Sequence, residues 1–219
     1  MPVHNWLPVP IGLYHHFHQS WAVILEEGLN NGVLPPGYFA LVDQRAIAHY
    51  VTQQTHREVF ASRANRVAVR NSLGELAALI EIVSPGNKNS KHAIRAFVFK
   101  TTEFIANGAN LLVIDLFPPT PRDPHGIHKA IWDELHEEPF ELPKDKRLTV
   151  AAYSADVPIT AYVEPIGVDD SLPGMPLYLE PGNYIPVPLE ETYQRTWEKC
   201  PEEMKEIVLG ANAPEAGNN

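Results

Sequence analysis

The feature that most constrains the fold is a pair of strongly apolar segments on either side of an amphipathic segment. Residues 76–83 are apolar apart from Glu81, and residues 111–117 are apolar apart from Asp115. Between them, apolar residues recur at helical spacing over residues 89–107. A strand, a helix and a strand within about 42 residues predict a βαβ unit with a right-handed crossover and parallel strands.

Alternating and periodic patterns in the rest of the chain predict an α+β fold with a mixed central sheet and flanking helices. We expect one domain, with a core over about residues 12–117, a proline-rich C-terminal extension over about 118–210 and a disordered tail over about 211–219. A turn at residues 71–74 predicts an antiparallel hairpin between strands 66–70 and 76–83. Further predicted helices cover residues 12–30, 125–136, 189 onward and 201 onward, and further predicted strands lie near residues 38–42, 46–51, 147–153, 160–166 and 176–180.

The composition favours a globular protein in a reducing compartment. The 219 residues are 44% hydrophobic, which is enough for a sizeable core. The net charge of -10 argues against a protein that coats nucleic acid, but it does not exclude a local basic groove. Cys200 stands alone, so no disulfide can form within the chain. The first residues do not resemble a secretory signal, and no apolar run is long enough to cross a membrane. We therefore expect a cytoplasmic protein without membrane contact.

Acidic residues on two buried parallel strands predict a functional site. Ionised carboxylates are costly on such strands unless a charge or a metal compensates them. Parallel strands would bring Glu81 and Asp115 to similar heights, where they could bind Mg²⁺ or Mn²⁺. The basic residues Lys88, Lys91 and Arg95 follow at helical spacing and could form a local patch for nucleic acid, with Lys88 stabilising phosphate charge.

A purely structural interpretation of these residues competes with the metal site. Glu81 could pair with Arg70 or Arg95, and the basic residues could form a solvated helix face. The sequence has no Gly-x-x-x-x-Gly-Lys-Ser/Thr motif, so the turn after Glu81 is not expected to be a nucleotide-binding P-loop. The charge pattern therefore leaves both interpretations open.

Two histidine pairs could in principle bind a transition metal. His15 and His18 are three residues apart, as are His125 and His128, but neither pair has a matching carboxylate motif. Asp123 is more simply interpreted as the cap of a short helix after it. Surface or hydrogen-bonded histidines are the expected outcome for both pairs.

Nucleophilic catalysis has little support in the sequence. Cys200 is surrounded by acidic residues, which disfavour its thiolate, and Ser84 is not part of a Gly-x-Ser-x-Gly elbow. The aromatic residues of the C-terminal part are expected to pin it to the core or to a second subunit. These residues are Tyr178, Tyr184, Tyr193 and Trp197.

Several motifs resemble a known family. Residues 80–88 and 107–117 look like those of the bacterial domain of unknown function (DUF) 4058 family, and residues 1–6, 34–38 and 126–133 match a subgroup of it. The resemblance covers most of the chain. It implies no established activity.

The hairpin, helix and strand also resemble, more remotely, the restriction-endonuclease-like core of the PD-(D/E)xK nuclease superfamily. In that frame Glu81 would match the acid of the third strand, whereas Val83 occupies the position of the lysine. Lys88, Lys91 or Lys100 would then have to supply the positive charge. Ala68 stands where the acid of the second strand is expected, so the resemblance supports the fold more than the activity.

Two functions are therefore expected. The first is a divalent-metal-dependent phosphodiesterase or nuclease, with Glu81 and Asp115 as metal ligands and Lys88 as the phosphate-stabilising group. The alternative is a non-catalytic binding or assembly module on the same fold, acting as a homo-oligomer or with a protein partner. The departures at Ala68 and Val83 and the acidic net charge favour the alternative.

Overall fold

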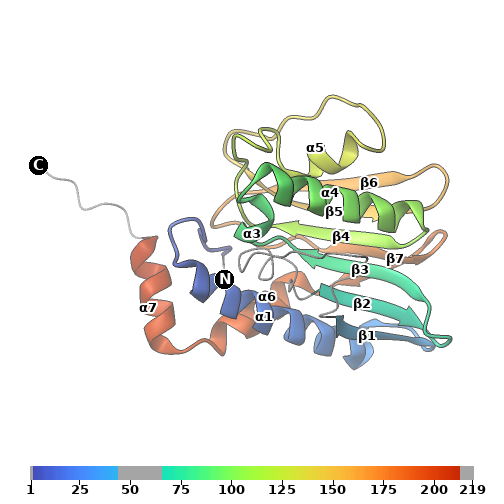
Figure 1. The fold of residues 1–219 in the computed structure, drawn as a ribbon. Coiled ribbons are helices and arrows are strands. Elements are labelled where there is room, and N and C mark those ends of the chain that lie inside the picture. Colours follow the sequence, from blue (N-terminus) through green and yellow to red (C-terminus); the bar gives the residue numbers. More distant parts are fainter. Residues whose placement is uncertain (1, 44–65, 213–219) are drawn as a thin grey trace, which may run out of the picture.

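The computed structural model describes residues 2–43 and 66–212 (Figure 1). At its centre is a six-stranded mixed sheet in the order β1-β2-β3-β4-β5-β6. The strands are β1 (Tyr38–Asp43), β2 (Arg66–Asn71), β3 (Leu76–Ile82), β4 (Asn110–Asp115), β5 (Leu148–Ser154) and β6 (Thr160–Ile166). The α+β class is confirmed.

The predicted hairpin and βαβ unit are both present. β2 and β3 are antiparallel, and β3 and β4 are parallel, with Ala78 beside Asn110 and Ile82 beside Ile114. Gly74 closes the hairpin turn at a φ of 80°, a left-handed conformation that glycine adopts without strain. The crossover consists of a short helix α3 (Pro85–Lys88) and the longer α4 (Lys91–Ala106).

Local sequence signals set the ends of α4. The hydroxyl of Ser90 accepts a hydrogen bond from the backbone N–H of Ala93 at 3.0 Å, as an N-cap should. After the helix, Gly108 adopts a φ of 82°, which turns the chain into β4. The start and the stop predicted for this helix are confirmed.

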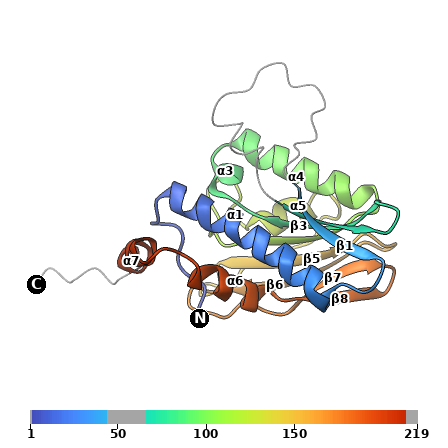
Figure 2. The same ribbon diagram turned by 90° about the horizontal axis from the view of Figure 1, so that it is seen from below.

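The remaining helices flank the sheet on both faces. Their bounds are α1 (Ile11–Gly28), α5 (Ile127–Trp132), α6 (Leu189–Glu198) and α7 (Glu202–Ala211). Helix α1 continues into η1 (Leu29–Val33), where the chain leaves helical geometry at Asn31 and Gly32. Helices α1 and α6 lie on one face, whereas α4 and α5 lie on the other (Figure 2). A two-stranded sheet of β7 (Met175–Glu180) and β8 (Asn183–Val187) packs on the same face as α1 and α6.

An aromatic cluster joins the N-terminal segment before α1 to helix α6. The hydroxyl of Tyr193, on α6, accepts hydrogen bonds from the backbone N–H of His4 at 3.2 Å and from the indole N–H of Trp6 at 3.1 Å. Trp197 stacks on the His4 ring with centroids 3.9 Å apart. Tyr193 and Trp197 therefore pin the C-terminal part to the core, as the sequence predicted.

The predicted C-terminal extension contributes to the main sheet. β5 and β6 complete its far edge, and β5 pairs directly with β4. Strand β8 was not predicted, because Asn183 and Pro186 within it disfavour a strand in a sequence-based assignment. The predicted strand at residues 46–51 lies outside the described residues. None of the described helices is long and apolar enough to cross a membrane.

Candidate functional site

Asp115 and Lys88 form the centre of a buried ionic cluster. The Lys88 ammonium lies 2.8 Å from Oδ2 of Asp115 and 2.9 Å from Oδ2 of Asp123. It also donates to the backbone carbonyls of Phe117 at 3.0 Å and Pro118 at 3.1 Å. A lysine has three N–H donors, so four oxygens at these distances use its entire donor capacity. With a side chain only 4% exposed, Lys88 cannot contribute to a surface patch.

Local structure explains why Lys88 points inward. β3 ends at Ile82, and the Ser84 and Asn87 side chains form a capping box around α3, with Pro85 in its first turn. This single helical turn places Lys88 at the end of β4, where Asp115 is the last residue of the strand and a proline-rich loop follows. The backbone N–H of Phe117 donates to Oδ1 of Asp115 at 3.1 Å, so both carboxylate oxygens have partners.

Asp123 closes the cluster from the loop that follows β4. Its Oδ1 accepts from the backbone N–H of Thr120 at 2.8 Å, while Oδ2 faces Lys88. The prediction that Asp123 caps the next helix is wrong, because Gly126 is the N-cap residue of α5. Asp123 instead fixes the loop to the ammonium group.

The cluster holds two carboxylates and one ammonium, and its ionisation reflects that balance. Burial raises the pKa of Asp115, and the nearby Lys88 offsets part of this rise. Burial alone would lower the pKa of Lys88, but Asp115 and Asp123 reverse the effect, so its pKa is raised. Four oxygens surround the amine of Lys88, and they favour its ammonium form.

Glu81 belongs to a second ionic cluster, under α4. Both of its carboxylate oxygens lie 3.0 Å from Nζ of Lys100, and Oε1 lies 3.5 Å from Nη1 of Arg66. Arg66 in turn pairs with Asp43 at 3.3 Å. The ring of Phe104 lies 5.2 Å from the Arg66 guanidinium, a cation–π distance. Glu81 is buried, whereas the Lys100 side chain is 32% exposed, so this cluster reaches the surface.

The two predicted acids share a face of the sheet but not a height. Glu81 is level with Val113 on β4, so Asp115 lies two residues further along. Side chains two residues apart point to the same face, and Val113 is part of the core under α4. Each acid has its own cationic partner, Lys100 or Lys88, and their predicted roles as metal ligands stay predictions.

The partners of Glu81 differ from those considered in the sequence. Arg70 donates to the carbonyl of Gly74 at 2.9 Å, and Arg95 is exposed on α4. Arg66 lies opposite Glu81 because the pairing of β2 with β3 shifts by one residue between Val69 and Arg70, and no signal in the sequence predicts that shift. Nor could Lys100 be identified, because its approach depends on how α4 is rotated over the sheet.

The remaining candidates are distributed over the molecule. Lys91 and Arg95 are exposed on α4, but the buried Lys88 does not form a surface patch with them. His15 and His18 lie on α1 with ring centroids 6.4 Å apart. His128 is buried with Nδ1 2.8 Å from the Tyr153 hydroxyl, while His125 is exposed. Among the described residues, no three His, Cys, Asp or Glu side chains form a group that could hold a metal ion.

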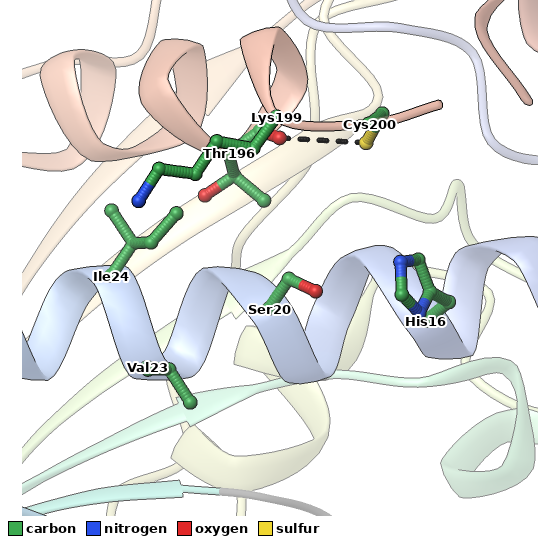
Figure 3. Close-up of a pocket in the computed structure, with 7 residues that line it drawn as sticks. All are labelled: His16, Ser20, Val23, Ile24, Thr196, Lys199 and Cys200. Atoms are coloured by element: carbon green, nitrogen blue, oxygen red, sulfur yellow. Dashed lines mark hydrogen bonds between the residues drawn. The ribbon is translucent and has the colours of Figure 1, made fainter. Parts of the chain in front are cut away.

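A pocket of about 280 Å³ lies between α1 and α6 (Figure 3). The Cys200 thiol at its end donates to the carbonyl of Thr196 at 3.4 Å, and burial raises its pKa. A thiol with a raised pKa is a poor nucleophile, in line with the structural role predicted for Cys200. The pocket is lined by His16, Ser20, Val23, Ile24, Thr196, Lys199 and Cys200.

Comparison with protein-family models, with curated proteins and with solved structures gives no match for this chain. The resemblances to the DUF 4058 family and to the nuclease superfamily therefore stay predictions from the motifs quoted above.

Proposed function

We propose that the chain is a non-catalytic binding module built on this α+β fold. The observation that carries the proposal is the pairing of the predicted catalytic groups with one another and with buried cations. Asp115 is bound to Lys88, and Glu81 is bound to Lys100 and Arg66. These groups stabilise the fold in the arrangement observed.

Binding of a divalent ion at Asp115 would have a large energetic cost. The ion would have to displace the Lys88 ammonium, which is almost completely buried. An unpaired buried charge costs several kcal/mol, about 3–5 kcal/mol where one partner of a buried pair has been removed. Because its N–H donors are already used by protein oxygens, Lys88 cannot donate to a phosphate group.

One observation favours a second candidate, the metal-dependent phosphodiesterase. Lys100 lies 3.0 Å from both oxygens of Glu81, so an acid and a lysine meet at a place that reaches the surface. This is the combination that the nuclease resemblance implies, with the lysine supplied by a helix. Mg²⁺ or Mn²⁺ would then bind at Glu81, and Lys100 would stabilise phosphate charge.

Calorimetric titration with Mn²⁺ separates the two functions. Wild type, Glu81→Ala and the more conservative Glu81→Gln are compared, with circular dichroism to establish that each is folded. The binding module predicts no Mn²⁺ binding in any of them, and no Mn²⁺-dependent cleavage of DNA or RNA by the wild type. Micromolar binding that is lost in folded Glu81→Gln would overturn the proposal in favour of the phosphodiesterase.

A further inference from the structure

Three tyrosines form a continuous stripe across β6, β7 and β8. The rings of Tyr162 and Tyr178 are stacked with centroids 5.7 Å apart, and those of Tyr178 and Tyr184 lie 5.6 Å apart. The outer residues Tyr162 and Tyr184 are 47% and 59% exposed. The sequence predicted that Tyr178 and Tyr184 would pin the C-terminal part to the core or to a second subunit. Tyr184 is largely exposed to solvent, so it does not pin this part to the core, and a contact with a second subunit stays a prediction.

The strands explain why these rings face outward. In β7, Leu177 and Leu179 are buried against the main sheet, so the alternate residue Tyr178 points away from it. Tyr178 is level with Tyr184 in the pairing of β7 with β8, and Ile185 takes the buried position on β8. The apolar core is therefore complete without the stripe.

The stripe lies in a strongly acidic part of the chain. Residues 148–194 contain seven acidic residues and no Lys, Arg or His. Glu164 is exposed on the same face of β6 as Tyr162, and Glu180, two residues after Tyr178, accepts a hydrogen bond from the Tyr38 hydroxyl. Asp156 is close enough to contribute to a raised pKa of about 12 for Tyr178, whose main cause is burial, followed by a hydrogen bond with Tyr162. Exposed aromatic rings among carboxylates favour a cationic ligand that is also apolar.

We propose that the tyrosine stripe binds an extended, proline-rich segment of a partner protein that carries two arginines three residues apart. This inference deepens the proposed binding function by naming the class of partner. Proline-rich segments adopt the polyproline II helix and dock on surfaces lined with aromatic rings. Their backbone is already ordered, so little conformational entropy is lost when they bind.

The spacing of the rings sets the spacing of the arginines. Two ring-to-ring steps, of 5.7 and 5.6 Å, separate Tyr162 from Tyr184. A polyproline II helix repeats every three residues, or about 9 Å. Arginines three residues apart therefore point in the same direction and can reach the two outer rings. A guanidinium stacks on a tyrosine face and can at the same time pair with a carboxylate such as Glu164.

Fluorescence anisotropy with a labelled synthetic peptide tests the proposal. The probe contains an Arg-Pro-Pro-Arg core between prolines, and two controls have adjacent arginines or glutamates in place of the arginines. We expect the probe to bind most tightly, its affinity to fall with added salt, and the glutamate peptide not to bind. Tyr162→Ala and Tyr184→Ala should each weaken binding about threefold to tenfold.

Matched variants separate the stripe from general charge attraction. Tyr184→Phe keeps the ring and should keep the affinity, and Phe99→Ser, at a 63% exposed aromatic residue on α4, should have no effect. Absence of probe binding, equal binding of all three peptides, or unchanged affinity in both alanine variants would overturn the inference. Binding of a neutral oligosaccharide instead of the probe, lost in the same variants, would also overturn it. None of these outcomes affects the proposed lack of metal chemistry, which the Mn²⁺ titration tests separately.

Discussion

The two ionic clusters lie on the same face of the sheet, but their surroundings differ. Lys88 is enclosed by Asp115, Asp123 and two backbone carbonyls. Glu81 lies between Arg66, which is also buried, and Lys100, which is partly exposed. The comparison shows that an acid on a buried strand can be neutralised from inside the protein or from its surface. The energetic consequences of removing one partner should differ accordingly.

Lys88→Met should cause the largest loss of stability. It leaves two buried carboxylates without a cation, and removal of one member of a buried pair costs about 3–5 kcal/mol. Urea denaturation measures the free energy of unfolding, with Lys91→Met at an exposed position on the next helix as the control. The control should change it by less than about 0.5 kcal/mol. A loss below about 1 kcal/mol in Lys88→Met would contradict the role assigned to the cluster.

Glu81→Gln should have an intermediate effect, of about 1–3 kcal/mol. The amide has the same size as the carboxylate but no charge, so Lys100 and Arg66 lose their shared anion. Arg66 keeps Asp43, which limits the loss. Thermal and urea unfolding of this variant measure the effect. A loss as large as that of Lys88→Met would show that the two clusters do not differ in the way proposed.

The pH dependence should distinguish the enclosed cluster further. Burial raises the pKa of Asp115 in the folded protein, and Lys88→Met removes the cation that limits this rise. Between the unfolded pKa and the raised folded pKa, the folded state binds more protons than the unfolded state, so lower pH favours folding.

The deficit of Lys88→Met relative to wild type should therefore shrink as the pH falls from about 7 to about 5, by at most about 1.4 kcal/mol per pH unit for each proton taken up. Urea unfolding of both proteins across this range tests the expectation. A deficit that is constant or grows with acidity would mean that Asp115 does not take up the proton.

Lys100→Met should have the smallest effect, below about 1 kcal/mol, because solvent screens a partly exposed ion pair. The difference from wild type should decrease when salt is added, whereas that of Lys88→Met should change little. Unfolding experiments at low and high salt compare the two variants. Equal salt sensitivity in both would remove the distinction between an enclosed and a surface-linked cluster.

Much of the fold follows from the sequence because local signals determine it. Ser90 and Gly108 mark the ends of α4, and the apolar runs around Glu81 and Asp115 identify β3 and β4. The short turn between β2 and β3 predicts their antiparallel pairing, whereas the position of Arg66 opposite Glu81 depends on a one-residue shift of register between Val69 and Arg70.

The pairing of charged residues in the candidate site depends more strongly on tertiary structure than the helices and strands do. The sequence identified Glu81, Asp115 and Lys88 as unusual because charges on apolar elements need compensation. It could not identify Asp123 as a second partner of Lys88, because the path of the proline-rich loop positions that carboxylate. Nor could it identify Lys100 as the partner of Glu81, since helical periodicity defines a buried face but not the helix's rotation over the sheet.

The sequence by itself determined the α+β class, the βαβ unit and the presence of buried charges, because helix caps, turns and apolar periodicity act over a few residues. Only the tertiary structure decided which charges meet and which tyrosines stay exposed. Lys88 with Asp115, and Tyr162 with Tyr178, are brought together by contacts between elements distant in the chain. Such contacts depend on how whole elements pack, which local patterns do not encode.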